Sequence, residues 1–107
     1  MSNLFKNCTN MTSIDLSNIN TREVIDTSYM FSSCVSIRDL IFSDFRTSNV
    51  INMSYMFHNC IRLNKLDINN FSTNEVTDMR NMFDNCNSLT SLNLIDLNFD
   101  NIIYVLY

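Results

Sequence analysis

Apolar and polar positions follow one another along this chain in a pattern that repeats every 26 residues. The cysteines mark the period, and four other apolar columns keep the same phase. These five columns are Cys8, Cys34, Cys60 and Cys86; Ile14, Leu40, Leu66 and Leu92; Val24, Val50, Val76 and Ile102; Met30, Met56 and Met82; and Phe31, Phe57 and Phe83. Such a period predicts stacked units that bury matching side chains in ladders. We therefore predict a single array over 1–107, with repeat units 8–33, 34–59 and 60–85 and partial units 1–7 and 86–107.

Each unit contains two local patterns. The stretch "LNKLDI" at 63–68 alternates in its second half, which is typical of a short strand. Between Val50 and Cys60 the apolar residues come at steps of three and four, which predicts a short helix. Expected N-caps of these helices are Asp26, Asn52 and Asp78, and expected left-handed residues at their ends are Asn7, Asn59 and Asn85. The predicted fold is an α/β repeat solenoid with one short parallel strand and one short helix per 26 residues.

Composition narrows the function classes. The chain has 107 residues, a net charge of −4 and no basic run, which argues against nucleic acid and anionic membranes as partners. It has no glycine, so glycine-rich phosphate loops are excluded, and Asn is expected where a turn needs positive φ. The first twenty residues show no secretion signal, and the apolar run "IIYVLY" at 102–107 is too short for membrane insertion.

The side chains that could carry chemistry have simpler structural interpretations. Zinc ligands usually come in close pairs, whereas an even spacing of 26 puts the four thiols in a row, so we interpret them as core residues rather than a metal site or disulfides. The methionine column could suggest copper, but it keeps the phase of the core. His58 lies near Cys60, yet its equivalents are Ser32 and Asp84, which indicates a surface position. With one His in the chain we expect no Ser/His/Asp set, no catalytic residue, no cofactor and no enzyme.

The strand face is the candidate binding surface. Residues five and seven places after each Cys should point outward between buried leucines, and they differ from unit to unit. They are Ser13, Asp15, Asp39, Ile41, Lys65, Asp67, Ser91 and Asn93. The same variation would also suit an unconstrained surface. A face of this size covers about 200 Å², below the roughly 800 Å² per partner of a standard interface, so a lone chain should bind weakly.

The stretch "FRTSNVINMSYMFHNCIRLNKL", residues 45–66, carries a family resemblance. Its pieces F-x-T-x-x-V, M-x-x-M-F and C-x-x-L-x-x-L are similar to those of the BspA-type leucine-rich repeat surface proteins, including the mycoplasma-type lipoprotein repeat of about 25 residues. The chain departs from that family in lacking turn glycines and a secretion signal, and its last unit drifts at "NFDNIIYVLY". The resemblance implies a cell-surface or secreted protein involved in adhesion and protein binding, without enzymatic activity.

Two functions follow as hypotheses. The first is a leucine-rich-repeat module that binds a protein or a surface glycan at the cell surface. The second is an intracellular or viral structural repeat protein without a dedicated ligand. Because the apolar residues Leu4 and Phe5 open the chain and "IIYVLY" closes it, we also expect end-to-end association of copies or dependence on flanking repeats.

Overall fold

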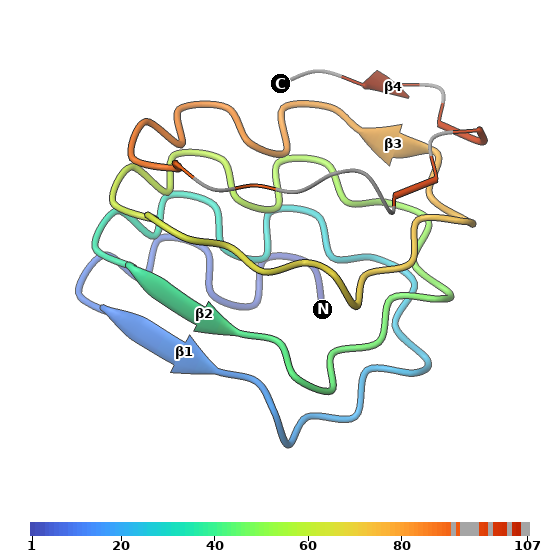
Figure 1. Ribbon diagram of the computed structural model, residues 1–107, viewed down its shortest axis with the longest axis horizontal. Coiled ribbons are helices and arrows are strands. Elements are labelled where there is room, and N and C mark those ends of the chain that lie inside the picture. Colours follow the sequence, from blue (N-terminus) through green and yellow to red (C-terminus); the bar gives the residue numbers. More distant parts are fainter. Residues whose placement is uncertain (91, 93–96, 99, 103, 106–107) are drawn as a thin grey trace.

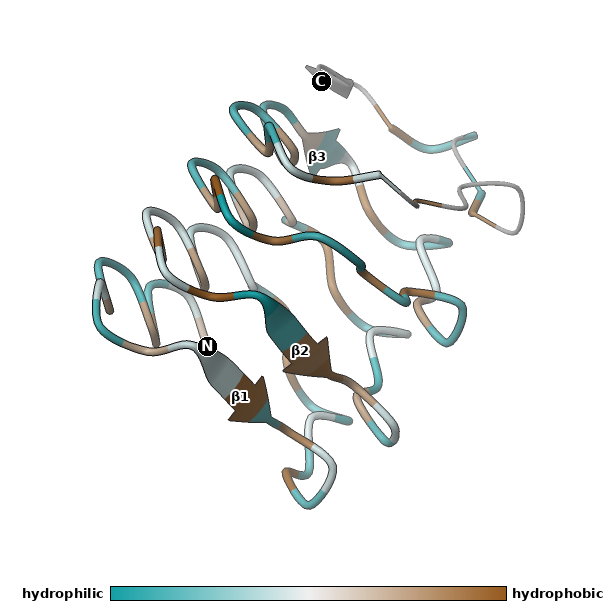
Figure 2. Ribbon diagram, turned by 60° about the vertical axis from the view of Figure 1, so that its left-hand side comes forward, coloured by the Kyte–Doolittle hydropathy of each residue, from teal (hydrophilic) through white to brown (hydrophobic). Residues whose placement is uncertain are grey.

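Four short strands, paired in parallel, form the regular elements of the fold (Figure 1). The computed structural model describes residues 1–90, 92, 97–98, 100–102 and 104–105. Strand β1 (Ser13–Asp15) pairs with β2 (Asp39–Ile41), and β3 (Asp78–Met79) pairs with β4 (Tyr104–Val105). Ser13 lies opposite Asp39, and Asp78 lies opposite Tyr104, each pair 26 positions apart. Consecutive segments of the chain therefore lie side by side and run in the same direction, as Figure 2 shows from a second side.

Strands β1 and β2 form where the side chains alternate between core and solvent. Ile14 and Leu40 are buried and opposite each other, whereas the residues on either side of each are exposed. A two-residue period of this kind suits a strand with one face on a core. Two isolated parallel bridges, from Asp26 to Asn52 and from Asn52 to Asp78, extend the β3–β4 pairing to earlier segments of the chain.

The predicted solenoid with a strand and a helix in each repeat is wrong. The described residues contain no helix, and their strands are two or three residues long. The radius of gyration is 12.5 Å, close to the roughly 13 Å of a compact domain of this length. The extents of 34 × 29 × 22 Å are those of a compact globule rather than an elongated array.

Consecutive tight turns occupy the segments that the sequence predicts as helices. In 53–60, the N–H groups of Met56, His58 and Cys60 each bond to the carbonyl three residues back. The N–H groups between them, on Tyr55, Phe57 and Asn59, instead donate to carbonyls of the next segment at 2.9–3.0 Å. A helix would direct every N–H to the fourth residue back. Here every second N–H joins neighbouring segments, and this explains why no helix forms.

The three features that predict helices all have a place in these turns. Asn59, Asn7 and Asn85 do have positive φ, between 60° and 63°, but they occupy the third position of a turn, as type II geometry requires. The expected N-caps accept the N–H two residues on, as in Ser28 to Asp26 at 2.8 Å, Ser54 to Asn52 at 2.9 Å and Arg80 to Asp78 at 3.0 Å. Turns of this kind also bring Met56, Phe57 and Cys60 inward at the spacing of a helical face.

The core consists of equivalent side chains stacked between neighbouring segments. The rings of Phe5, Phe31, Phe57 and Phe83 stack in one column with centroids 5.6–5.7 Å apart. The side chains of Met30, Met56 and Met82 are buried throughout the same region. Matching residues therefore fill the interior in rows, and the core is continuous along the chain.

Buried threonine hydroxyls provide a further link between segments. The Thr47 hydroxyl accepts the N–H of Ser72 and donates to its carbonyl, both at 2.8 Å. Thr73 makes the same pair of bonds to Asn98, and Thr21 accepts the N–H of Arg46 at 2.7 Å. Each hydroxyl thus takes the place of a peptide group in the pairing of two parallel segments. Its hydrogen bonds hold the backbone of the residue 25 positions later in the chain.

Candidate functional site

The residues of the predicted binding face are exposed wherever the structure describes them. Ser13 and Asp39 are opposite each other in β1 and β2, and so are Asp15 and Ile41. The Ile41 side chain is 45% exposed and lies beside Asp15 of the paired strand. Lys65 and Asp67 are exposed on the next segment. Ser91 and Asn93 lie outside the described residues.

Two carboxylates of this face already serve the fold. Asp15 accepts the backbone N–H of Ser17 at 2.9 Å and the hydroxyl of the same residue. These two hydrogen bonds hold the pKa of the Asp15 carboxyl below its usual value, the hydroxyl contributing more. Asp67 accepts the N–H of Asn69 at 3.0 Å in the same way. In the described part of this face, the exposed side chains without such a turn bond are Ser13, Asp39, Ile41 and Lys65.

A hollow of about 370 Å³ extends the face beside β2. Its lining includes Ile41, Ser43, Asp67 and Asn70, so it adjoins the predicted residues Ile41 and Asp67. The Asn70 amide donates to the Ser43 carbonyl at 3.4 Å across it. The predicted face is therefore concave next to Ile41 rather than flat.

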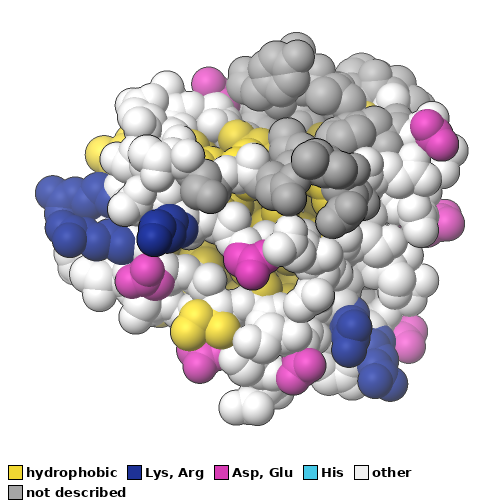
Figure 3. Space-filling model, viewed as in Figure 1, with side chains coloured by type: hydrophobic (Ala, Val, Ile, Leu, Met, Phe, Trp, Pro, Cys, Tyr) yellow, Lys and Arg dark blue, Asp and Glu magenta, His cyan; other side chains and the backbone are white. Residues whose placement is uncertain are grey.

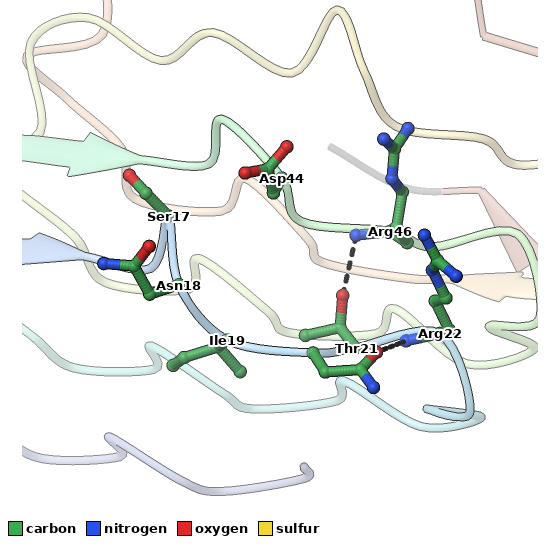
Figure 4. Close-up of a pocket in the computed structure, with 8 residues that line it drawn as sticks. Ser17, Asn18, Ile19, Thr21, Arg22, Asp44 and Arg46 are labelled. Carbon is green, nitrogen blue, oxygen red and sulfur yellow. Dashed lines mark hydrogen bonds between the residues drawn. The ribbon is translucent and has the colours of Figure 1, made fainter.

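A larger hollow of about 510 Å³ lies where the chain leaves β1, and the sequence analysis missed it (Figure 4). Ser17 and Asn18 line one end, Arg22 and Arg46 line the other, and Asp44 lies between the two ends. The backbone at the cationic end is fixed, because Thr21 accepts the N–H of Arg46 and Asn20 accepts that of Arg22 at 3.2 Å. Arg22 and Arg46 are 24 positions apart, so only the stacking of segments brings them together.

Three of the four cysteine thiols, those of Cys34, Cys60 and Cys86, donate hydrogen bonds to backbone carbonyls. All four are free, Cys34 and Cys60 are buried, and Cys8 and Cys86 are half-buried. The thiol of Cys60 donates to the Phe31 carbonyl at 3.2 Å, and that of Cys86 donates to the Phe57 carbonyl at 3.1 Å. Burial raises the pKa of Cys34 and of Cys86 to about 11 and raises that of Cys60 as well. Protonated thiols of this kind are poor nucleophiles and poor metal ligands.

Ser32, His58 and Asp84 lie in one row across three segments, although the sequence analysis expected no such set. The Ser32 hydroxyl is 3.4 Å from His58 Nδ1, and His58 Nε2 is 3.5 Å from a carboxylate oxygen of Asp84. Ser32 is only 2% exposed, which keeps a substrate carbonyl away from it. The N–H groups of Ser33 and Cys34 are both taken by carbonyls, so they form no oxyanion hole. The row links three segments, and its serine is buried.

Two stacked tyrosines lie beside this row, next to His58. Tyr29 and Tyr55 stack with ring centroids 4.6 Å apart, and the Lys6 ammonium lies 4.8 Å from the centre of the Tyr29 ring. Both tyrosines have a φ of 57°, in a turn position that Asn3 and Asn81 occupy in other segments. A bulky residue costs about 1–2 kcal/mol in this conformation, and the stacking offsets part of it. The faces of the two rings are thus used within the fold.

Charged groups elsewhere are spread thinly. In Figure 3 the acidic side chains are scattered over the visible face, and the basic side chains gather at separate places. No group of three or more metal-ligating side chains occurs in the described part of the chain. Nor does that part contain any helix long and apolar enough to cross a membrane.

The family described as Mycoplasma protein of unknown function, DUF285, matches residues 1–105. The chain belongs to this family. No curated protein matches it, and no solved structure does. Membership in DUF285 covers nearly the whole chain and, by its description, assigns no activity.

Proposed function

We propose that this DUF285 chain is a non-enzymatic module that binds a macromolecular partner, in a cell-surface protein involved in adhesion. The observation that carries the proposal is the face of β1, β2 and the segment after them. There Ile14, Leu40 and Leu66 are buried, and the side chains between them are exposed and differ from one segment to the next. A regular frame with unlike exposed side chains is the arrangement in which repeat proteins bind partners.

Two further points support binding over catalysis. The repeat motif in residues 45–66 is similar to that of the BspA-type surface proteins, whose properties suggest adhesion at the cell surface. The buried thiols and the inaccessible Ser32 offer no nucleophile, and a binding role requires none. Ile41 beside the hollow next to β2 is the residue on which we expect a partner to pack.

Adhesion of coated beads tests this function. Beads carrying the full chain are counted on cultured cells and on surfaces coated with purified extracellular-matrix proteins. We expect counts well above those of albumin-coated beads, and a loss of most of this excess in Asp39→Lys/Asp67→Lys and in Ile41→Ser. The second variant leaves the turn bonds of Asp15 and Asp67 intact, so it separates binding from folding.

Glu23→Lys/Glu75→Lys is the matched control, because it makes the same change in net charge around a different hollow. Thermal unfolding should show that all these variants remain folded. Beads that adhere no better than albumin beads would overturn the proposal. The same conclusion would follow if both face variants adhered as well as the original chain.

A further inference from the structure

Two arginines stand side by side in the larger hollow. Arg22 and Arg46 are both exposed, and among the described residues neither guanidinium group makes a salt bridge. Their side chains point the same way from neighbouring segments in Figure 4. In a chain with 7 basic and 11 acidic residues, two adjacent unpaired cations repel each other with no gain for the fold.

One and two segments on, the positions equivalent to Arg22 and Arg46 hold uncharged residues. Ser48 and Ser72 are the equivalents one segment on, and Asn74 and Asn98 two segments on. The Asn98 amide donates to the Asn74 side chain at 3.0 Å, which shows that these positions bring side chains into contact. The backbone is held in the same way each time, by Thr21, Thr47 and Thr73. The fold therefore does not need arginine here.

Apart from Ile19, the rest of the lining is polar and offers oxygen atoms that accept hydrogen bonds. Ser17 and Asn18 line the end away from the guanidinium groups, and Asp44 lies between that end and Arg46. Paired guanidinium groups bind carboxylate, phosphate or sulfate with short, oriented hydrogen bonds. Carboxylate, amide and hydroxyl oxygens suit the hydroxyl groups of a sugar. A volume of about 510 Å³ is large enough for one or two sugar rings.

We propose that this hollow binds a saccharide that carries an anionic group, with Arg22 and Arg46 on the anion and Asp44 on the hydroxyl groups. The inference rests on the proposed binding function and deepens it by naming a class of ligand. An acidic protein can hold an anionic ligand here because the two cations lie together and attract it locally. A single sugar should bind in the millimolar range, because one small ligand offers few contacts.

Titration of the ¹⁵N-labelled chain with glucuronic acid, glucose 6-phosphate and glucose 6-sulfate tests the site, with glucose, inorganic phosphate and sulfate as comparisons. We expect the Nε–H signals of Arg22 and Arg46 to shift with at least one anionic sugar, and its affinity to exceed that of glucose and of the inorganic anion. Arg22→Gln and Arg46→Gln should each weaken binding about ten-fold, and Asp44→Asn should weaken it less. Arg62→Gln, which removes an exposed arginine outside the hollow, should leave it unchanged.

A gain of binding makes the test sharper. Ser48→Arg/Ser72→Arg builds the same pair one segment on, where Asn70 takes the place of Asp44, and it should add a second, weaker site. The absence of any shift with the three anionic sugars would overturn the proposal. Equal affinity for inorganic phosphate or sulfate would overturn the saccharide as ligand. Beads that adhere through Asp39 and Ile41 despite such a failure would leave the proposed function standing.

Discussion

Each cysteine after the first sits where its thiol can donate to a carbonyl that already accepts a backbone N–H. The Phe31 carbonyl, for example, accepts the N–H of Cys34 at 3.1 Å and the thiol of Cys60 at 3.2 Å. A carbonyl has two lone pairs, and a second donor lowers the cost of burying it. The small, weakly polar thiol suits this position, since it fills core space and bonds across segments. The cysteine column is thus explained by packing and one hydrogen bond per segment.

These thiols should make the protein sensitive to alkali. Burial raises the pKa of Cys34 and Cys86 to about 11, above the roughly 8.5 of an unfolded thiol. Their contribution to stability is therefore complete below about pH 8.5 and is lost as the pH rises toward 11, because the unfolded chain releases the proton first. Each thiol can contribute up to about 1.4 kcal/mol per pH unit.

Urea unfolding between pH 7 and 11 measures this effect. We expect a constant free energy of unfolding at pH 7–8 and a steep fall above about pH 9, with a shallower fall in Cys60→Ala because one buried thiol is gone. Curves of equal steepness for the two proteins would show that the buried thiols do not titrate as described.

At the scale of the element, threonine hydroxyls replace peptide groups in joining segments. Thr47→Val keeps the shape of the side chain but leaves the N–H and the carbonyl of Ser72 without their partner. Each buried unsatisfied group costs about 1–3 kcal/mol, so we expect the free energy of unfolding to fall by about 2 kcal/mol or more. Thr47→Ser keeps the hydroxyl and loses a methyl group, which should cost about 0.8 kcal/mol. A valine variant as stable as the serine variant would contradict the role of the hydroxyl.

The elements also show where the sequence was informative. The spacing of Met56, Phe57 and Cys60 correctly indicated which side chains face the core, and Asn59 correctly indicated positive φ. The helix between them was wrong because consecutive turns produce the same spacing. A helix and a series of turns differ in the acceptor of every second N–H, for example the Met82 carbonyl that accepts the N–H of Phe57. That acceptor lies in another segment, so a local sequence pattern does not reveal it.

Part of the candidate sites could be predicted from the sequence, and part could not. The exposure of Asp39, Ile41 and Lys65 follows from strand alternation, which the sequence displays. The proximity of Arg22 and Arg46 cannot be predicted in this way, because it depends on how the turns of two neighbouring segments stack. The repeat period gave a usable signal all the same, since basic residues stand in two columns that are otherwise uncharged or acidic. Aligning the 26-residue units and comparing columns two positions apart would have found the pair.

At the scale of the whole molecule, the first segment presents apolar side chains that the described part of the chain covers only in part. Leu4 is 51% exposed, and Phe5 is the first ring of the phenylalanine column, stacked on Phe31 alone among the described residues. A second copy could extend the column by stacking on Phe5. We expect sedimentation velocity to show association that increases with protein concentration and weakens in Leu4→Asp. A clean monomer at millimolar concentration would exclude this association.

The central claim is that hydrogen bonds from alternate N–H groups join consecutive segments in parallel register, in place of helices. Scalar couplings across hydrogen bonds, measured by NMR between amide nitrogen and carbonyl carbon, test it most directly. We predict couplings from Phe31 N to the Met56 carbonyl and from Phe57 N to the Met82 carbonyl, whose N–O distances are 2.9 and 3.0 Å. A coupling from Phe57 N to the carbonyl of Met53, four residues back, would show a helix and contradict the account.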